Sequence, residues 1–403
     1  MNVAVTPFTA RLRSFPTSRR PMPVPIIKAG ILIGLFSALI QFSTSLQAEA
    51  FLDKFKDPED GWIDGSDWLL NNAVGFLPLP IIITEPAVGA GLGVAGLFFH
   101  PPKDPDPDAE FIFPSVTVAA AAITSNDTWL AGGGHFGNWK KDSIRYSGFV
   151  GYTSINLKFY PPGPAGRDSG LGLKFNGEGA FIFQDLLFRI KGTNWWFGGN
   201  QELAGVDIDF DGGTEPPVDS AVLETTSSAL GLTARYEDVD STFTPSRGLI
   251  AKLNYLRYDD AIGSDFNANK ISASLFKYWQ LRSNLVLGLR VDGKFTSDDL
   301  PFYMLPFIDL RGIPALRYQG TDVVLGETEV RWNFHPRIGA VGFLGAGRAA
   351  DSFDDLSSAP SRVTKGVGLR YYAAKKLGMH MGFDIARGPD ETAYYLTFGS
   401  AWR

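Results

Sequence analysis

The sequence of 403 residues contains no cysteine and only four histidines. It therefore has no disulfide framework, no thiolate metal site and no cysteine nucleophile. It also has no Gly-x-Ser-x-Gly motif, the signature of one large class of serine hydrolases, and we expect neither enzyme activity nor a cofactor. The acidic balance, with 43 Asp and Glu against 37 Lys and Arg, argues against a nucleic-acid partner.

Long apolar runs are also missing after the N-terminal region. The best candidate for a membrane helix, residues 68–84, contains Asn71, Asn72, Pro78 and Pro80, and the prolines would break a helix. No later stretch reaches the roughly 18 apolar residues that a spanning helix needs. A membrane protein built from helices is therefore not expected.

Glycine, by contrast, is abundant, with 45 residues. Residues 89–96, GAGLGVAG, include the Gly-x-Gly-x-x-Gly spacing of a dinucleotide-binding loop. Such a loop needs a helix that begins inside it, but Pro101 and Pro102 follow too soon for one. With a period of two, Leu92 and Val94 share an apolar face opposite the glycines. We therefore predict a β-strand in place of a nucleotide site.

The first 50 residues resemble an export signal. A lead with five basic residues is followed by residues 29–42, a charge-free apolar segment that is short of the roughly 20 residues needed to span a bilayer. Small residues flank Glu49, so we predict a signal peptide over residues 1–50, cut after Ala50, with a membrane anchor as the alternative. The cut removes five basic residues and one acid, which changes the formal net charge from −6 to −10.

From about residue 87 onward, apolar and polar residues alternate in segments separated by turn residues. In residues 285–295, for example, apolar side chains alternate with Arg290, Asp292 and Lys294. Such a pattern fits a soluble sandwich with an apolar core, or a membrane barrel with lipid outside and a wet lumen. The segments span about 10–14 residues, which is closer to tilted membrane strands of about 9–11 residues than to soluble strands of about 5–6. Together with the export signal, they favour an all-β fold, a transmembrane antiparallel β-barrel.

Fifteen such segments can be placed, whereas closed bacterial barrels have an even number of strands. We therefore predict sixteen strands over residues 81–403. The missing strand is expected among residues 78–86 or within a divided segment 143–159. Residues 51–80 would form a short periplasmic or plug segment before the barrel, and the sequence leaves both possibilities open.

The connections between segments differ in length. We expect a short periplasmic turn at Gln184–Asp185 and long outer loops at residues 199–222 and 297–321. Residues 207–212 begin like a calcium loop, but the twelfth position is Val218 where glutamate is required. An ordinary acidic loop and no metal site are predicted, with weak calcium binding as the alternative.

Four stretches in the C-terminal half resemble a known family. Residues 236–248 combine an Asp-rich turn with an aromatic residue, a proline and a glycine. The stretch 310–313, LRGI, follows three segments later, and residues 326–331, GETEVR, and 341–347, VGFLGAG, come after it. In this order the motifs are similar to those of BamA/TamA-type outer-membrane barrels, the bacterial surface antigen family.

The resemblance implies a loop that folds back into the lumen, where acidic residues of the next strands hold its arginine. Carried over, Arg311 and Gly312 form the tip of this loop, and Arg311 pairs with Glu329. The second acid is expected two residues after Phe343, where this sequence has Gly345. We therefore predict that a single acid, Glu329, holds Arg311 in the lumen; this predicted contact of the loop is called the lock below.

The family also implies a weak seam between the first and last strands and a terminal aromatic residue as an assembly signal. Residues 396–402 would form one side of the seam, with Phe398 and Trp402 on the outer face of the last strand. Family members that insert or secrete proteins carry periplasmic POTRA modules, and residues 51–80 are too few for even one.

We therefore expect a bacterial outer-membrane barrel in envelope biogenesis, for the insertion or transport of proteins or lipids. The expected partners are outer-membrane lipid and either unfolded outer-membrane proteins or a periplasmic protein, and the barrel is expected to be a monomer. A passive pore or a structural surface antigen is the alternative, followed by an outer-membrane enzyme.

Overall fold

A computed structural model describes residues 55–68, 75–100, 114–161, 167, 170, 172–210, 223–297 and 300–402. The predicted signal peptide with its cleavage site lies outside these residues, as does the acidic stretch 211–222. No helix in the described part of the chain is both long and apolar enough to span a membrane.

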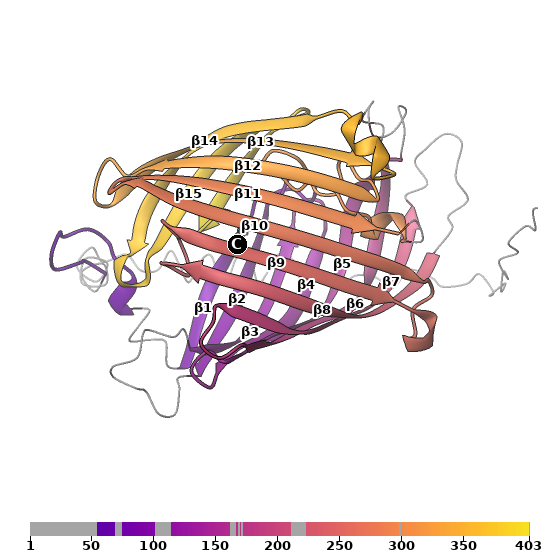
Figure 1. Ribbon diagram of the computed structural model, residues 1–403, viewed down its shortest axis with the longest axis horizontal. Coiled ribbons are helices and arrows are strands. Elements are labelled where there is room, and N and C mark those ends of the chain that lie inside the picture. Colours follow the sequence, from indigo (N-terminus) through magenta and orange to yellow (C-terminus); the bar gives the residue numbers. More distant parts are fainter. Residues whose placement is uncertain are drawn as a thin grey trace, which may run out of the picture. The chain divides into compact units, whose positions relative to one another are not determined.

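Within the described residues, sixteen antiparallel strands follow one another in chain order around a nearly closed barrel (Figure 1). The strands are β1 (Gly75–Ile83), β2 (Gly91–His100), β3 (Ser115–Thr124), β4 (Trp129–Trp139), β5 (Ile144–Phe159), β6 (Leu173–Arg189), β7 (Trp195–Phe210), β8 (Leu223–Val239), β9 (Gly248–Tyr258), β10 (Ala268–Arg282), β11 (Leu285–Thr296), β12 (Asp322–Trp332), β13 (Ile338–Ala350), β14 (Arg362–Ala374), β15 (Met379–Arg387) and β16 (Thr392–Phe398). Short 3-10 helices in the connections are η2 (Asp260–Ile262), η3 (Phe302–Met304), η4 (Asp354–Ser357) and η5 (Lys375–Leu377). The predicted sixteen-stranded barrel is confirmed, and the strand that the sequence left unplaced is β1.

The alternating pattern sorts side chains between the outside and the lumen. On β2, Leu92 and Val94 are 60 % and 56 % exposed, although both are apolar, while Gly91 and Gly93 take the inward positions. Inward positions of β12 and β15 hold Glu327 and Asp384, both almost fully buried. The Gly-x-Gly-x-x-Gly stretch therefore lies in a strand, as predicted. An apolar outer face over a polar interior is the arrangement of a barrel surrounded by lipid.

Several predicted boundaries are wrong. Gln184 and Asp185, predicted as a turn, lie inside β6, and residues 199–210, predicted as part of an outer loop, belong to β7. Asp207 and Asp209 consequently lie in extended β7 and not in a calcium loop. The barrel also begins at Gly75 and not at residue 81. The reason in β6 and β7 is that polar residues inside a strand, such as Asp185 and Asn200 at the polar hollow, look like turn residues in a sequence.

The barrel has a seam between β1 and β16. Among the described residues β1 pairs only with β2, and β16 pairs only with β15. The ladder between β1 and β2 is unbroken from Gly75 to Ile83, although proline has no N–H to donate. The residues of β1 whose N–H groups bond to β2 must therefore be those that alternate with Pro78 and Pro80. Both prolines therefore lie where an N–H would face the seam, and β1 lacks two donors along that edge.

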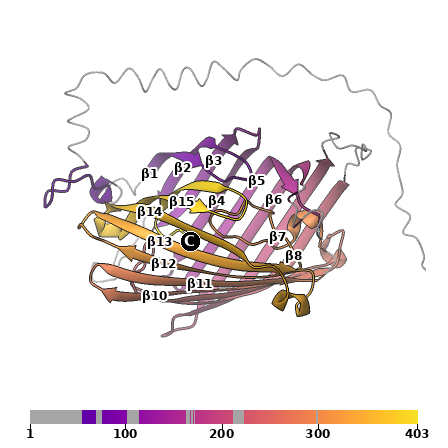
Figure 2. The same ribbon diagram turned by 90° about the horizontal axis from the view of Figure 1, so that it is seen from above.

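The connection between β11 and β12, residues 297–321, is called the inner loop below, and its described residues, 297 and 300–321, fold into the lumen. Its residues Ile308, Leu310 and Ile313 pack against Val323 and Leu325 of β12. At the other side of the lumen, further inner-loop side chains pack against inward-facing residues of β5, β6 and β7; these inner-loop residues are Phe302, Tyr303, Phe307 and Leu316. The two groups of strands lie in facing walls of the barrel (Figure 2), so the inner loop crosses the lumen as a plug.

Candidate functional site

The tip of the inner loop is placed by glycine. Gly312 has a φ of +93°, which favours a residue without a side chain, and a Cβ there would lie 2.8 Å from the backbone nitrogen of Gly388. The Gly312 N–H donates to the Tyr395 hydroxyl at 2.8 Å, across the lumen side of β16. The loop therefore reaches the last strand and the turn before it, and it presents Arg311 inward.

Arg311 contacts acids from two strands. Its Nη1 lies 2.7 Å from Oδ2 of Asp384 on β15, and its Nη2 lies 2.5 Å from Oε1 of Glu327 and 2.8 Å from Oε2 of Glu329 on β12. The guanidinium also stacks on Phe343, 3.5 Å from the ring centroid. The Arg311 guanidinium thus pairs with several carboxylates and stacks on an aromatic ring, and both interactions favour arginine over lysine.

The prediction of a single acid is wrong, although the predicted Arg311–Glu329 contact is present. Glu327 shares the inward face of β12 with Glu329, and Asp384 comes from β15, a strand outside the predicted contacts of Arg311. Asp384 is also bound by Arg370 on β14, with 3.0 Å between Nη2 and Oδ2. The position of the expected second acid, Gly345, lies under the loop, because a Cβ there would be 3.1 Å from Leu310.

Trp402 is not on the outer face of the last strand. β16 ends at Phe398, and Gly399 follows with a φ of +79°, which turns the chain inward. Inside the barrel, the Trp402 indole Nε1 donates to Oε1 of Glu327 at 2.5 Å, so the arginine network includes the C-terminal aromatic residue. Phe398 itself points outward and is 61 % exposed, as predicted. The prediction for Trp402 was wrong because it extended the two-residue alternation of β16 beyond Gly399, where the left-handed backbone ends that alternation.

Changing Trp402 to phenylalanine is expected to weaken the barrel. The substitution keeps a ring beside Tyr278 but removes the indole donor to Glu327. Loss of a hydrogen bond to a charged group costs about 1.5–3 kcal/mol, so the unfolding midpoint in denaturant should fall. Phe398→Leu, an apolar exchange on the lipid face, serves as the control and should change the midpoint little. Equal midpoints for Trp402→Phe and the wild type would contradict an inward Trp402.

The inner loop also touches both sides of the seam. On the β1 side, the Ala315 N–H donates to Oε1 of Glu85, in the turn after β1, at 3.1 Å. On the β16 side, Nε of Arg317 lies 2.8 Å from Oδ2 of Asp390, in the turn before β16, and the Tyr318 hydroxyl donates to the same oxygen. The inner loop therefore bridges the seam at the end of the barrel where β1 ends and β16 begins.

Two polar hollows lie in the remaining half of the barrel. One, of about 780 Å³, is lined by the turns β8–β9, β10–β11, β12–β13 and β14–β15, and the other, of about 920 Å³, lies against β4 to β9. Val239 and Thr242 line both, so the hollows adjoin. The charged side chains there are mostly paired, as in Arg145 with Asp142 at 2.6 Å. This half of the lumen is therefore hollow and polar, and no described residue of the inner loop lines it.

Comparison with solved structures supports the fold. The chain is similar to the structure of BamA from Haemophilus ducreyi lacking POTRA domains 1–3, with a TM-score of 0.55, 12 % identity and coverage of 81 % of this chain and 70 % of that chain. It is also similar to CdiB from Escherichia coli, with a TM-score of 0.51, 14 % identity and coverage of 80 % of this chain and 61 % of that chain. No family model matches the sequence, and no curated protein matches it. At these identities the likeness concerns the barrel fold alone.

Proposed function

We propose that the protein is a BamA/TamA-type barrel of the bacterial outer membrane that inserts or transports proteins or lipids through an openable seam. The observation that carries the proposal is the unpaired β1–β16 seam, at which Pro78 and Pro80 remove two donors. A barrel whose only role is to span the membrane gains from a complete ladder, because unpaired backbone groups in lipid cost several kcal/mol each. A persistent gap is therefore more useful to a barrel that admits another strand or a lipid.

The plugged lumen supports the same function. The inner loop packs against both walls and is held by Arg311, so passage straight through the barrel is obstructed. The polar hollows outside the inner loop give polar cargo a place inside the barrel. Outer-membrane lipid and unfolded outer-membrane proteins are the proposed partners of this non-enzymatic barrel, with no cofactor.

A folding assay tests the insertion role. The purified protein is reconstituted in liposomes, and a urea-denatured outer-membrane barrel is added as the client. We expect the client to become heat-modifiable on a gel faster than with empty liposomes or with liposomes carrying an unrelated porin of equal mass. Equal client folding in all three samples would remove protein insertion from the proposed function.

A passive pore is the second candidate, and the two adjoining polar hollows favour it. Planar-bilayer recording separates the candidates, because a plugged barrel should give small, erratic currents and an open pore a large, steady conductance. Replacing residues 302–318 with a glycine-serine linker is expected to produce the large, steady conductance, since it removes the plug. A large, steady current from the wild type would favour the pore, and heat-modifiability on a gel verifies that each variant is folded.

A further inference from the structure

We propose that residues 55–68, called the strap, form a releasable clasp that holds the seam shut at the end opposite the inner-loop contacts. The inference rests on the proposed opening of the seam and adds the part of the chain that controls it. It assigns a role to a segment that the sequence left open as a tail or a plug.

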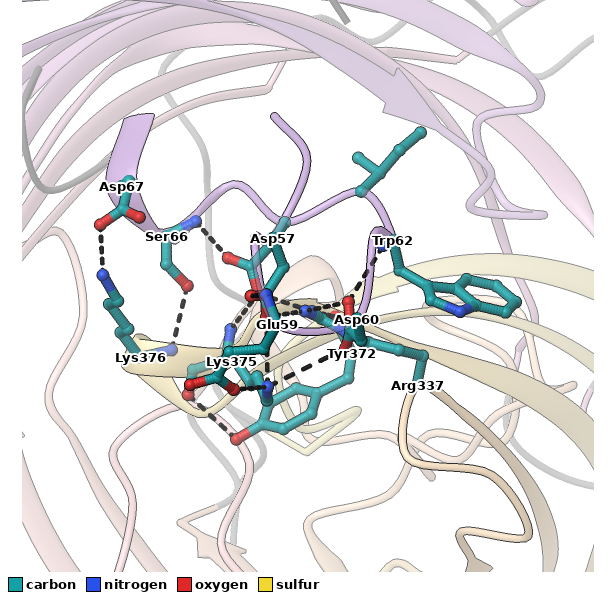
Figure 3. Close-up of polar contacts among 12 residues, drawn as sticks. Asp57, Glu59, Asp60, Trp62, Ser66, Asp67, Arg337, Tyr372, Lys375 and Lys376 are labelled. Carbon is teal, nitrogen blue, oxygen red and sulfur yellow. Dashed lines mark hydrogen bonds and ion pairs between the residues drawn. The ribbon is translucent and has the colours of Figure 1, made fainter. Parts of the chain in front are cut away.

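One end of the strap is bound to the turns β12–β13 and β14–β15 (Figure 3), which lie on the β16 side of the seam in the strand order. Three of its acids surround Arg337, in the turn between β12 and β13: Nε of Arg337 lies 2.6 Å from Asp60, Nη1 lies 2.5 Å from Asp64, and Nη2 contacts Asp57. The Arg337 side chain is fully buried by these contacts. In the turn between β14 and β15, Lys375 adds ion pairs to Asp57 at 3.1 Å and to Glu59 at 2.8 Å, so the acids are bound from two turns.

Backbone contacts fix the strap in the same place. The Gly65 N–H donates to the carbonyl of Ala373, at the end of β14, at 2.7 Å. The Tyr371 hydroxyl donates to the Ile63 carbonyl at 2.5 Å, and the ring of Trp62 lies 6.2 Å from that of Tyr371. The strap is therefore a docked element of the barrel and not a free tail.

The other end of the strap lies on the β1 side. Trp68 packs against a cluster formed by Leu77 of β1, Phe99 of β2 and Val116 of β3. Only six residues separate Trp68 from Gly75, where β1 begins. A strap docked on Arg337 thus ties the start of β1 to the turns of β12 to β15, across a seam that has no ladder of its own.

The strap and the inner-loop contacts hold the two sides of the seam together by different interactions. The inner-loop contacts are backed by a buried apolar cluster around Ile308 and Leu310 and by the nearly buried Arg311. The strap depends on ion pairs, which are buried at Arg337 and exposed at its edge, where the side chain of Glu59 is 78 % exposed and that of Lys375 is 34 % exposed. The exposed pair is screened by salt and contributes little, and the buried pairs at Arg337 hold only while the carboxylates are ionised. Because the strap's contacts with the turns β12–β13 and β14–β15 depend on ionised carboxylates more than on an apolar cluster, the strap releases first, and opening of the seam starts at its end.

Acid should also release the strap. The hydrogen bond from Arg337 lowers the pKa of Asp60. Burial alone would raise the pKa of Asp64, but hydrogen bonds from Ser66 and Arg337 outweigh it and lower that pKa. A carboxylate with a lowered pKa stabilises docking above its value in the free chain, about 3.9, and loses this contribution as the pH falls through the lowered value. The strap is expected to stay docked at neutral pH and to release below about pH 4.

Hydrogen exchange in lipid nanodiscs tests the clasp. The triple variant Asp57→Asn, Asp60→Asn and Asp64→Asn keeps the size of each side chain and removes the charges around Arg337. We expect residues 55–68 and 75–83 to exchange about tenfold faster than in the wild type, because hydrogen bonds between charged groups are lost. The control Asp67→Asn, which removes only the exposed pair with Lys376, should leave both segments unchanged.

A cysteine cross-link provides the matched rescue, since the chain has no cysteine of its own. In the triple variant, Gly65→Cys and Ala373→Cys join the strap to β14 when oxidised, and exchange in β1 should return to the wild-type rate. A strap that stays protected without its charges, or a released strap with unchanged exchange in β1, would overturn the clasp. If exchange in β1 rises while assisted client folding stays at the level of empty liposomes in every variant, the clasp stands and the proposed insertion function fails.

Discussion

Replacing Arg311 with alanine is expected to lower the barrel's resistance to heat and its yield on refolding. Asp384 and Glu329 would then keep Arg370 as an ion-pair partner, and Glu327 would keep the Trp402 indole donor. Asp384 and Glu327 are almost fully buried. Removing one partner of a buried ion pair costs about 3–5 kcal/mol, because the other charge stays buried. The expected result is a gel band that loses its compact, heat-modifiable form at a lower temperature than the wild type.

Two further variants show whether the effect belongs to the lock. Arg311→Lys should fall between alanine and the wild type, since lysine keeps the charge but cannot bind several acids with a planar fork. Arg257→Ala, which removes a 40 % exposed arginine paired with Asp259, should cost at most about 1 kcal/mol. If Arg311→Ala melts like Arg257→Ala, the inner loop is held by its apolar contacts and not by the arginine network.

The barrel itself was predictable because its pattern is local and repeated. Each strand needs only an apolar residue at every second position, as at Leu92 and Val94, and fifteen copies of a weak signal give a clear architecture. An even strand number and a nearly closed barrel then follow from the cost of unpaired backbone groups in lipid. Neither step requires knowing which side chains meet across the lumen.

The arginine network was only partly predictable for the opposite reason. Asp384 lies 73 residues from Arg311 in the chain, and it reaches the loop because of strand register and barrel curvature, which no local pattern encodes. Arg337 and the acids of the strap are still further apart, since Arg337 and Asp60 are separated by 277 positions in the chain. The Asp-rich composition of residues 57–67 was the available signal, but an acidic stretch by itself is more often a solvated surface.

The opposite change in stability is expected at the seam, where the paired substitutions Pro78→Val and Pro80→Val should strengthen the barrel. Both prolines are exposed on the lipid face of β1, so valine fits there and is a good strand former. Each change restores an N–H that points toward β16, and β16, Thr392–Phe398, contains no proline to limit pairing. Two additional backbone hydrogen bonds would contribute about 1–3 kcal/mol in total, so the heat-modifiable band should persist to a higher temperature.

Pro78→Val with Pro80→Val should also abolish most assisted client folding, because β1 and β16, once hydrogen-bonded to each other, offer no free strand edge to an incoming strand. Ile82→Val, on the same face of β1 and without a new donor, is the matched control and should leave both heat resistance and client folding as in the wild type. A barrel that becomes more stable yet folds its client at the wild-type rate would show that the seam is not the route of insertion. A barrel that gains no stability would show that the two missing donors are not what keeps β1 and β16 apart.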